Sequence, residues 1–408
     1  MPVGSAADGV TSMVTLTPIA TTNSFRRVTH TTVSKRMTSS THPPRKDHGC
    51  ASTGEHDCDA QSTPNLMGAE AHRELKGRPG RADEHSMATT EISSTATPLQ
   101  LATAIADGLH ESLASVIRGK HDALRLAGVA VLSGGHILLE DVPGVGKTLL
   151  AKAIARSIQG TFRRIQGTPD LLPADLTGVS VLDPAEGTWR FRPGPLFANV
   201  VLVDEINRAT PRTQSALLEA MEEGQVSADG ATRRLPDPFI VIATQNPKEH
   251  AGTFPLVEGQ RDRFAIALEL GLPDRDAERE ILTGTGGSAT LEHITPIADA
   301  DALRRTAGVI DTVHVAPPLV EYLLDIVAAT RRDEGVTLGA SPRASLSMLR
   351  SAQAYAIADA RNYVTPDDVK AVAAAALGHR LILSGGPDLT RGRAVVEAIL
   401  RRVPPPRG

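Results

Sequence analysis

The chain has 408 residues, enough for two or more domains of ordinary size. Its 43 basic and 47 acidic residues leave a formal net charge of −4, and aromatic residues make up only 3% of the chain, which argues against a nucleic-acid-binding protein. Two cysteines, Cys50 and Cys58, do not form a disulfide framework and indicate a reducing, cytoplasmic setting. No apolar run reaches the roughly 18 residues that span a bilayer.

Residues 1–97 are rich in Ser, Thr, Gly, Pro and His and lack a sustained apolar period, so we expect a disordered tail. The basic bias of the first 46 residues resembles a transit peptide, but no amphipathic pattern accompanies it. A disordered tail, or a protein that starts at Met87, is the simpler interpretation. The His-x-Cys motifs at 48–50 and 56–58 have a spacing that matches no zinc pattern, so we predict no metal site there.

From residue 98 the apolar pattern becomes regular, and helices are expected over 98–130. Short apolar runs then alternate with helical patterns, which predicts a parallel sheet covered on both faces. Two hairpins interrupt the alternation, with turn residues at Asp183-Pro184 and at Asp229-Gly230. The expected strands are HILLE, FRRIQ, VVLVDE and FIVIAT, the helices are KTLLAKAIARSI and SALLEAMEEG, and the hairpins are VSVLDPAEGTWRFR and QVSADGATRRL.

Beyond Gly271-Leu272-Pro273 the strand signals stop, and residues 274–383 and 388–402 show mostly helical patterns. Thr365-Pro366-Asp367 supplies a cap and a proline at the first position of one of these helices. The predicted organisation is a disordered tail at 1–97, an α/β core at 98–272 and a helical domain at 273–408.

The segment EDVPGVGKT, residues 140–148, joins the strand HILLE to the helix that begins at Lys147. A glycine-rich loop in this place lets backbone N–H groups close around phosphates, and the helix adds its positive N-terminal end. Lys147 is expected to neutralise the β- and γ-phosphates of ATP, and Thr148 to ligate Mg²⁺. The predicted nucleotide-binding residues are Val142, Pro143, Gly144, Val145, Gly146, Lys147, Thr148, Leu149 and Asp204.

Asp141 departs from the general pattern G-x-x-x-x-G-K-[ST], which has Gly at that position. Asp tolerates unusual backbone angles better than most residues, so we expect the loop to form. The alternative for the whole segment is a tight strand–helix turn with a surface lysine.

The strand VVLVDE ends in two acids. Asp204 is expected to belong to the Mg²⁺ shell, and Glu205 to polarise the attacking water as general base. Asn246, at the end of FIVIATQNP, is a candidate for orienting that water, although an Asn-Pro turn explains the same residues.

Two arginines complete the candidate catalytic set. In EGQRDRF, Arg263, with Arg261 as second choice, is predicted to point into a neighbouring subunit's nucleotide site, where it offsets charge on the transferred phosphoryl group. A solvated surface arginine is the alternative. In ASPRA, Pro342 places Arg343 in the first turn of a helix, where the dipole disfavours a cation. Because a residue that breaks a local rule is a functional candidate, Arg343 is predicted to reach the γ-phosphate from the helical domain of the same chain.

Together these segments resemble the AAA+ superfamily and, within it, the MoxR family, over about residues 98–405. The resemblance implies an α/β fold, a P-loop AAA+ parallel sheet with flanking helices and β-hairpin insertions, followed by an all-α lid domain. The segments that carry it are LLEDVPGVGKT, RIQGTPDLLPADLTG, FRPGPLFANVVLVDEINRATPRTQSALLEAMEE, ATQNP, EGQRDRF and LGASPRASL.

The resemblance also implies residue roles: Lys147 and Thr148 as the Walker A pair, Asp204 and Glu205 as the Walker B pair, Asn246 as sensor 1, Arg263 as the arginine finger and Arg343 as sensor 2. It implies a hexameric ring, inserted hairpins at 179–192 and 225–235 that face the pore or partners, and an adenine near Val116 and Ile117. Members of the family often carry Glu-Asp before the phosphate loop, as this chain does.

The chain departs from the family pattern at Gly167, where an aromatic residue is frequent, at Lys248 and His250, where an apolar residue and Gln are usual, and at Arg261, which replaces a usual Leu. We expect these positions to lie in loops that face substrate or a neighbour. They therefore bear on partner choice rather than on ATP binding.

The favoured function is a chaperone-like motor that hydrolyses ATP to remodel or mature a partner protein, with a von Willebrand factor A domain partner expected by resemblance. An ATPase subunit of a metal chelatase, which has the same inserted hairpins, is an open alternative. A nucleic-acid motor fits poorly with the net charge, and Glu205 argues against a scaffold that binds ATP without hydrolysing it.

Overall fold

The computed structural model describes residues 96–246, 252–284 and 287–407, which belong to one compact unit spanning Met87–Gly408. The predictions for the tail up to residue 95, including the His-x-Cys motifs and a start at Met87, lie outside the described residues. So do the departures at Lys248 and His250. Within the described ranges, no helix is both long and apolar enough to cross a membrane.

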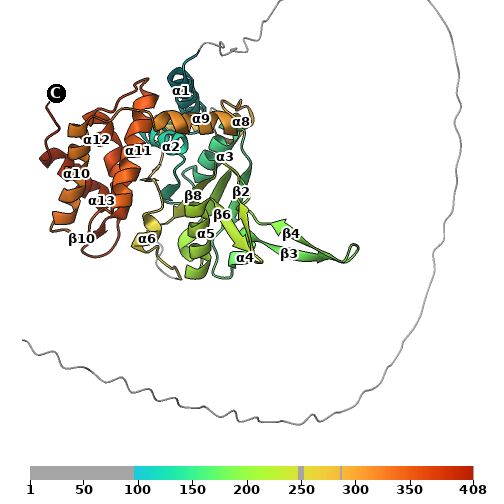
Figure 1. Ribbon diagram of the computed structural model, residues 1–408. Coiled ribbons are helices and arrows are strands. Elements are labelled where there is room, and N and C mark those ends of the chain that lie inside the picture. The colour runs from blue at the N-terminus through green and yellow to red at the C-terminus, as the bar shows by residue number, and fades with distance from the viewer. Residues whose placement is uncertain (1–95, 247–251, 285–286, 408) are drawn as a thin grey trace, which may run out of the picture. The chain divides into compact units, whose positions relative to one another are not determined.

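A parallel sheet forms the centre of the α/β region (Figure 1). It has five strands in the order β2-β5-β8-β1-β9. Its strands are β1 (Ile137–Glu140), β2 (Phe162–Gln166), β5 (Val200–Asp204), β8 (Ile240–Gln245) and β9 (Ile266–Leu268). Four of them, β1, β2, β5 and β8, were predicted from the sequence. The three-residue strand β9 was not predicted, and it forms the edge next to β1.

Helices cover both faces of this sheet, because successive strand residues point to opposite sides. Ile137 and Leu139 belong to one apolar cluster, whereas Leu138 between them belongs to a second. The first cluster includes α3 (Lys147–Ser157), and the second includes α5 (Pro211–Glu223). The predicted parallel sheet with flanking helices is thus confirmed. The remaining helical segments up to residue 310 are α1 (Pro98–Val116), α2 (His121–Leu132), α4 (Pro173–Thr177), η1 (Ile206–Arg208), α6 (Glu258–Arg261), α7 (Arg275–Leu282), α8 (Gly287–Glu292) and α9 (Ala300–Ile310).

Both predicted hairpins are present as antiparallel pairs outside the main sheet. One pairs β3 (Gly178–Asp183) with β4 (Thr188–Pro193) and extends away from the sheet (Figure 1), and the other pairs β6 (Gln225–Ala228) with β7 (Ala231–Arg234). The two hairpins contact each other, because Asp229 accepts a hydrogen bond from the Ser180 backbone N–H and Arg233 lies 3.8 Å from the centre of the Phe191 ring. Trp189 on β4 is 71% exposed, so this hairpin presents apolar surface to solvent.

The carboxyl-terminal region is helical, as predicted, but it also holds a short antiparallel ribbon. The ribbon pairs β10 (Val336–Leu338) with β11 (Ile382–Leu383), so the expectation that strands end before residue 274 is wrong at these two segments. The predicted helix ending in GHRLIL stops at Leu377, and a single 3₁₀ turn leads into β11. The helical elements are α10 (Pro317–Arg332), α11 (Pro342–Ala358), α12 (Pro366–Leu377), η2 (Gly378–Arg380) and α13 (Leu389–Arg402).

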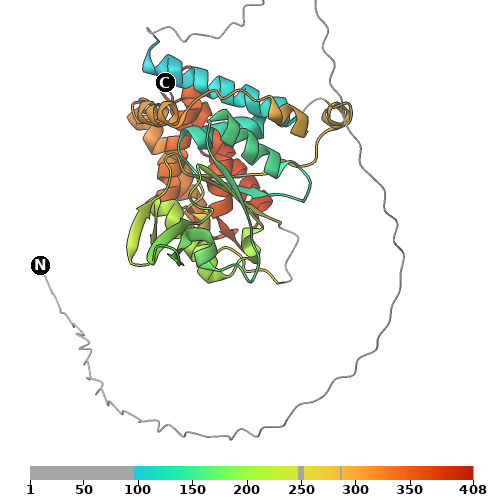
Figure 2. The ribbon, with the colours of Figure 1, turned by 90° about the vertical axis from the view of Figure 1, so that its right-hand side faces the viewer.

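Helix α1 joins the sheet region to this helical lid. It packs on α2, α3 and α9 and also on α11, and Figure 2 shows it in cyan along one side of the folded part. Its residues Leu109 and Leu113 are fully buried in the apolar cluster that also contains residues of α11 and α12. The core therefore continues from one region into the other.

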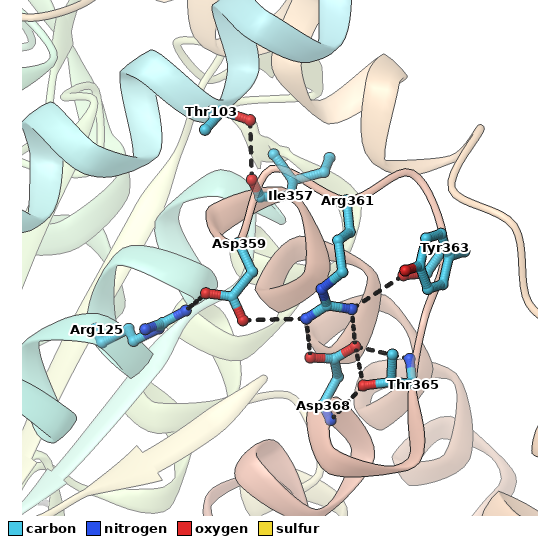
Figure 3. Close-up of polar contacts among 8 residues, drawn as sticks. All are labelled: Thr103, Arg125, Ile357, Asp359, Arg361, Tyr363, Thr365 and Asp368. Carbon is cyan, nitrogen blue, oxygen red and sulfur yellow. Dashed lines mark hydrogen bonds and ion pairs between the residues drawn. The ribbon is translucent and has the colours of Figure 1, made fainter.

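A polar network reinforces the same junction (Figure 3). Arg125 on α2 pairs with Asp359, which follows α11, and Asp359 also accepts from Arg361 at 3.0 Å. The Arg361 guanidinium donates to both oxygens of Asp368 at 2.6 and 2.7 Å. Thr103 on α1 donates to the Ile357 carbonyl at 3.0 Å. The turn between α11 and α12 is thus tied to both α1 and α2.

Candidate nucleotide-binding and catalytic site

The phosphate-binding loop predicted from the sequence connects β1 to α3. Gly144 and Gly146 have φ values of 89° and 100°, which side chains rarely adopt. A Cβ added to either glycine would meet no atom within 4 Å, so the backbone angle and not a lack of space requires glycine here. The first turn of α3 carries N–H groups without helical partners, and its residues Lys147 and Thr148 line a cavity of about 250 Å³.

Asp141 fastens this loop to the edge of the sheet. One oxygen of its carboxylate accepts the backbone N–H groups of Leu270 and Gly271, at 2.6 and 2.8 Å, and the other accepts that of Val142 at 3.0 Å. Its φ is negative. The sequence-based reason for tolerating Asp at this position was therefore wrong: the residue acts through its side chain, and its backbone is not in the left-handed region.

Lys147 lies between the loop and the predicted Walker B acids. Its Nζ donates to the Asp141 carbonyl at 2.8 Å. Burial lowers the pKa of Lys147, and the charges of Asp141, Asp204 and Glu205 act in the opposite direction. The lysine charge is thus held next to two carboxylates in the same cavity.

Asp204 and Glu205 sit where β5 leaves the sheet. Glu205 has φ 55° and ψ 50°, a left-handed conformation that costs a non-glycine residue about 1–3 kcal/mol and that clusters at functional sites. Thr244 on β8 supports both acids, because its hydroxyl accepts the Glu205 N–H at 3.0 Å and donates to Asp204 at 3.3 Å. The strain is therefore held in place by a neighbouring strand.

Two side chains of β2 also reach these acids. Arg164 Nε lies 2.6 Å from Asp204 Oδ2, and Gln166 donates to Glu205 Oε2 at 2.9 Å. Sequence reasoning missed both residues, as well as Thr244. The available signal was their spacing: residues two apart on a strand share one face, and Gln166 is paired in register with Asp204.

One cavity brings together most of the predicted site. Its lining includes the candidate base and the candidate sensor, Glu205 and Asn246, together with Asp204. Among the predicted nucleotide-binding residues, Val142 and Val145 do not line it. The others that do are Pro143, Gly144, Gly146, Lys147, Thr148 and Leu149.

The two predicted arginines lie elsewhere. Arg263 and Arg343 both form ion pairs with Glu222, in the last turn of α5, and line a separate cavity of about 320 Å³. The structure thus brings the two arginines together but does not bring Arg343 to the phosphate loop of its own chain, in contrast to the prediction. The second choice for the finger, Arg261, is only 3% exposed and faces Glu140, with Nη2 and Oε1 3.8 Å apart, so it does not point out of the subunit.

Gly167, a further departure from the family pattern, lies within the described residues. Gly167 lies against the Walker B turn, where an added Cβ would be 2.3 Å from the Glu205 carbonyl oxygen, and its N–H donates to the Asp204 carbonyl at 2.7 Å. Gly167 and Arg261 therefore pack inside the subunit, contrary to the expectation that they face substrate or a neighbouring subunit. Val116 and Ile117 are buried in the apolar core, and their contact with adenine stays a prediction.

Comparisons with known proteins agree with this site. Residues 136–266 match the model of the ATPase family associated with various cellular activities (AAA), and residues 328–402 match the AAA lid domain. An uncharacterized Bacillus subtilis protein, YeaC, is 45% identical over 293 residues, which cover 72% of this chain and 91% of that protein. Chaperone MoxR1 of Mycobacterium tuberculosis is 42% identical over 278 residues, which cover 66% and 73%.

A solved structure shares the fold as well. A crystal structure of a Cytophaga hutchinsonii protein described as an ATPase superposes with a TM-score of 0.68 at 36% identity, covering 76% of this chain and 97% of that one. The lining of the phosphate-loop cavity, the two family matches and the identity to these relatives agree. The chain belongs to the MoxR family of AAA+ ATPases and is an ATP hydrolase.

Proposed function

We propose that this chain binds ATP with Mg²⁺ in the cavity at the phosphate loop and uses hydrolysis to remodel or mature a partner protein. The observation that carries the proposal is the shared lining of that cavity by Lys147, Thr148, Asp204, Glu205 and Asn246. These side chains come from three segments far apart in the sequence. A surface lysine on an ordinary strand–helix turn would not explain their convergence.

Each residue has a role that its chemistry supports. Lys147 neutralises phosphate charge, and the N–H groups at the start of α3 hold the phosphate oxygens. The Thr148 hydroxyl and the Asp204 carboxylate are the hard oxygen ligands that Mg²⁺ prefers, and the ion, when bound, neutralises charge on the phosphates. Glu205 accepts a proton from the attacking water, and Asn246 orients that water.

Arg263 and Arg343 act, in this proposal, on the nucleotide of a neighbouring subunit. Both lie with Glu222 and outside the cavity of their own phosphate loop. Guanidinium groups aimed at a phosphoryl group in transfer stabilise the charge that develops on it. We therefore assign the trans role to both arginines, and the site is complete only when two subunits meet.

This arrangement supports a ring, which AAA+ ATPases generally form, and we propose a hexamer. A chaperone-like role is supported by the relative named Chaperone MoxR1. We further propose a von Willebrand factor A domain protein as partner and the hairpins β3–β4 and β6–β7 as the surface that meets partners. The exposed Trp189 on β4 supports that use. We also propose that residues 98–272 form the ATPase core and residues 273–408 the lid, and that the protein is cytoplasmic.

The direct test compares Glu205→Gln with Lys147→Ala in ATP binding and steady-state hydrolysis. Glu205→Gln should retain binding and lose hydrolysis by about a hundredfold or more, roughly the contribution of a positioned base. Lys147→Ala should weaken binding itself. Glu219→Gln, an exposed acid on α5, serves as the matched control. Undiminished hydrolysis in Glu205→Gln would remove that residue from the base role.

Assembly is tested separately by dilution. A trans-acting arginine predicts that the rate per chain falls as subunits separate, and that Arg263→Ala lowers the rate of the assembled protein without preventing nucleotide binding. A rate per chain that is independent of concentration, down to conditions in which sedimentation shows monomers, would contradict the ring motor.

A further inference from the structure

Two arginines from distant parts of the chain share one carboxylate. Arg263 follows α6, Arg343 lies in the first turn of α11, and both form ion pairs with Glu222 in the last turn of α5. Burial and then the neighbouring charge of Arg343 lower the pKa of Arg263. Two guanidinium groups this close repel each other, so the carboxylate between them is what keeps both side chains together.

The backbones that carry these arginines are also fastened to each other. Asp262, directly before Arg263, accepts a hydrogen bond from the Ser341 hydroxyl at 2.8 Å, and Ser341 is the N-cap of α11. The other oxygen of Asp262 lies 2.9 Å from Nε of Arg380, a buried residue of η2. The segment that carries Arg263 and the start of α11 are therefore held against each other by Asp262, and a further partner is needed only to fix the direction of the two arginine side chains.

Glu222 is well placed to be that partner because α5 connects it to the catalytic turn. The helix begins shortly after Glu205 and η1, and it spans 13 residues, or about 20 Å at the usual rise. Gln214 secures its first half, since its side-chain amide donates to the carbonyls of Ile206 and Phe254 at 3.1 and 2.9 Å. One rigid element thus carries the acid that holds the arginines at one end and follows the Walker B acids at the other.

We propose that Glu222 is a positioning residue that holds Arg263 and Arg343 side by side, ready for the terminal phosphate of a nucleotide bound to the neighbouring subunit. This inference rests on the proposed trans role of the arginines. Glu222 touches neither substrate nor metal in this account. Its effect is on the turnover of the neighbour's site, because oriented donors contribute mainly where charge develops in the transition state.

The first test is a kinetic comparison of Glu222→Gln, Glu222→Asp and the control Glu223→Gln in the full chain. Glu222→Gln should lower kcat about ten- to a hundredfold, the usual effect of a small misplacement of a catalytic group, with KM for Mg·ATP changed by about twofold or less. Glu222→Asp keeps the charge and should recover part of kcat. Glu223→Gln removes another exposed acid, at the next position, and should match the wild type. A wild-type kcat in Glu222→Gln overturns the inference.

The second test mixes subunits to separate this inference from the function on which it rests. Glu222→Gln subunits keep their own base, and Glu205→Gln subunits keep correctly held arginines. In a mixed ring, the hydrolysis rate per Glu222→Gln subunit should therefore be several-fold higher than in a ring of Glu222→Gln subunits alone. Arg263→Ala subunits mixed with Glu205→Gln should recover in the same way. If only the Arg263→Ala mixture recovers, Glu222 does not act on the neighbour and the inference fails. If neither recovers, the trans role itself fails.

Discussion

Gln166 on β2 donates a hydrogen bond to Oε2 of Glu205, the candidate base, over 2.9 Å. Arg208 Nε lies 3.2 Å from the same oxygen. An oxygen that already accepts these donors has less capacity left for a proton from water. The neighbouring strand therefore restrains the base in the conformation described here.

Removing that restraint should raise the basal rate. A hydrogen bond of this kind contributes about 0.5–1.5 kcal/mol, so we expect Gln166→Ala to increase hydrolysis without partner about two- to tenfold. Arg163→Ala, an exposed change at another position of β2, should leave the rate unchanged. Steady-state phosphate release measures both variants, and a lower rate in Gln166→Ala would show that the bond supports the base instead of restraining it.

The contacts of the Asp141 carboxylate predict that Gly, the residue of the general motif at this position, destabilises the protein. Asp141→Gly restores the residue that the general phosphate-loop pattern has, yet it removes three hydrogen bonds from a buried acceptor. We expect a loss of about 2–4 kcal/mol in the free energy of unfolding, since bonds to charged groups contribute more than neutral ones. Urea unfolding compares it with Asp170→Ala, an exposed acid that should cost little. Equal stability of Asp141→Gly and the wild type would refute this role.

His136 predicts how stability depends on pH. Its Nδ1 accepts the Val241 N–H and its Nε2 donates to the Met221 carbonyl, both at 3.0 Å, so the buried ring is neutral. Burial lowers the pKa of His136 to about 4, although the bond to Met221 opposes the shift. The unfolded chain takes up this proton near pH 6.5, so stability is full above 6.5 and falls as the pH drops towards 4, by about 3 kcal/mol in all.

The measurement for His136 is the free energy of unfolding at pH 7.5 and 5.5. The wild type should lose about 1 kcal/mol per pH unit from this residue below pH 6.5, and His136→Gln should lack that part of the slope. Identical slopes in the two proteins would mean that His136 does not titrate as its surroundings imply.

Asp368, drawn in Figure 3, and its sequence neighbour Asp367 offer a matched pair of acids at the start of α12. The Asp368 side chain is 2% exposed and accepts from Arg361 and Thr365, whereas that of Asp367 is 88% exposed and pairs with Lys370 at the surface. Asp368→Asn should cost about 3 kcal/mol or more, because it breaks a buried pair. Asp367→Asn should cost about 0.5 kcal/mol or less. Calorimetric unfolding that shows equal shifts in Tm would contradict the difference.

The sequence predicted the parts of the fold whose signal is local. Strands β1, β5 and β8 are nearly continuous apolar runs, and the two hairpins carry their own turn residues. Strand β9 was not predicted because three residues are too few to show a period, and β11 was not predicted because LIL continues an apolar helical pattern. In both segments the strand exists because a neighbouring strand pairs with it, and that pairing is tertiary.

The candidate site likewise contains residues that local motifs predict and contacts that they do not. Lys147 and Glu205 stand in motifs that combine residue type with a place between strand and helix, so their neighbourhood could be predicted. The contacts of Glu222 with Arg263 and Arg343 join segments far apart in the sequence, and no local pattern marks them. Sequence order does not show which cavity the start of α11 faces. The prediction that Arg343 acts on the nucleotide of its own chain could therefore not be checked before the structure.

The measurement that tests the account most directly is calorimetric titration of the full chain with ATP and Mg²⁺, repeated with Lys147→Ala. We expect saturable binding of one nucleotide per chain in the wild type and an affinity at least about tenfold lower in the variant, because the lysine neutralises the phosphates that the loop receives. Absence of binding to the wild type, or equal affinity in Lys147→Ala, would contradict a nucleotide site at the turn between β1 and α3.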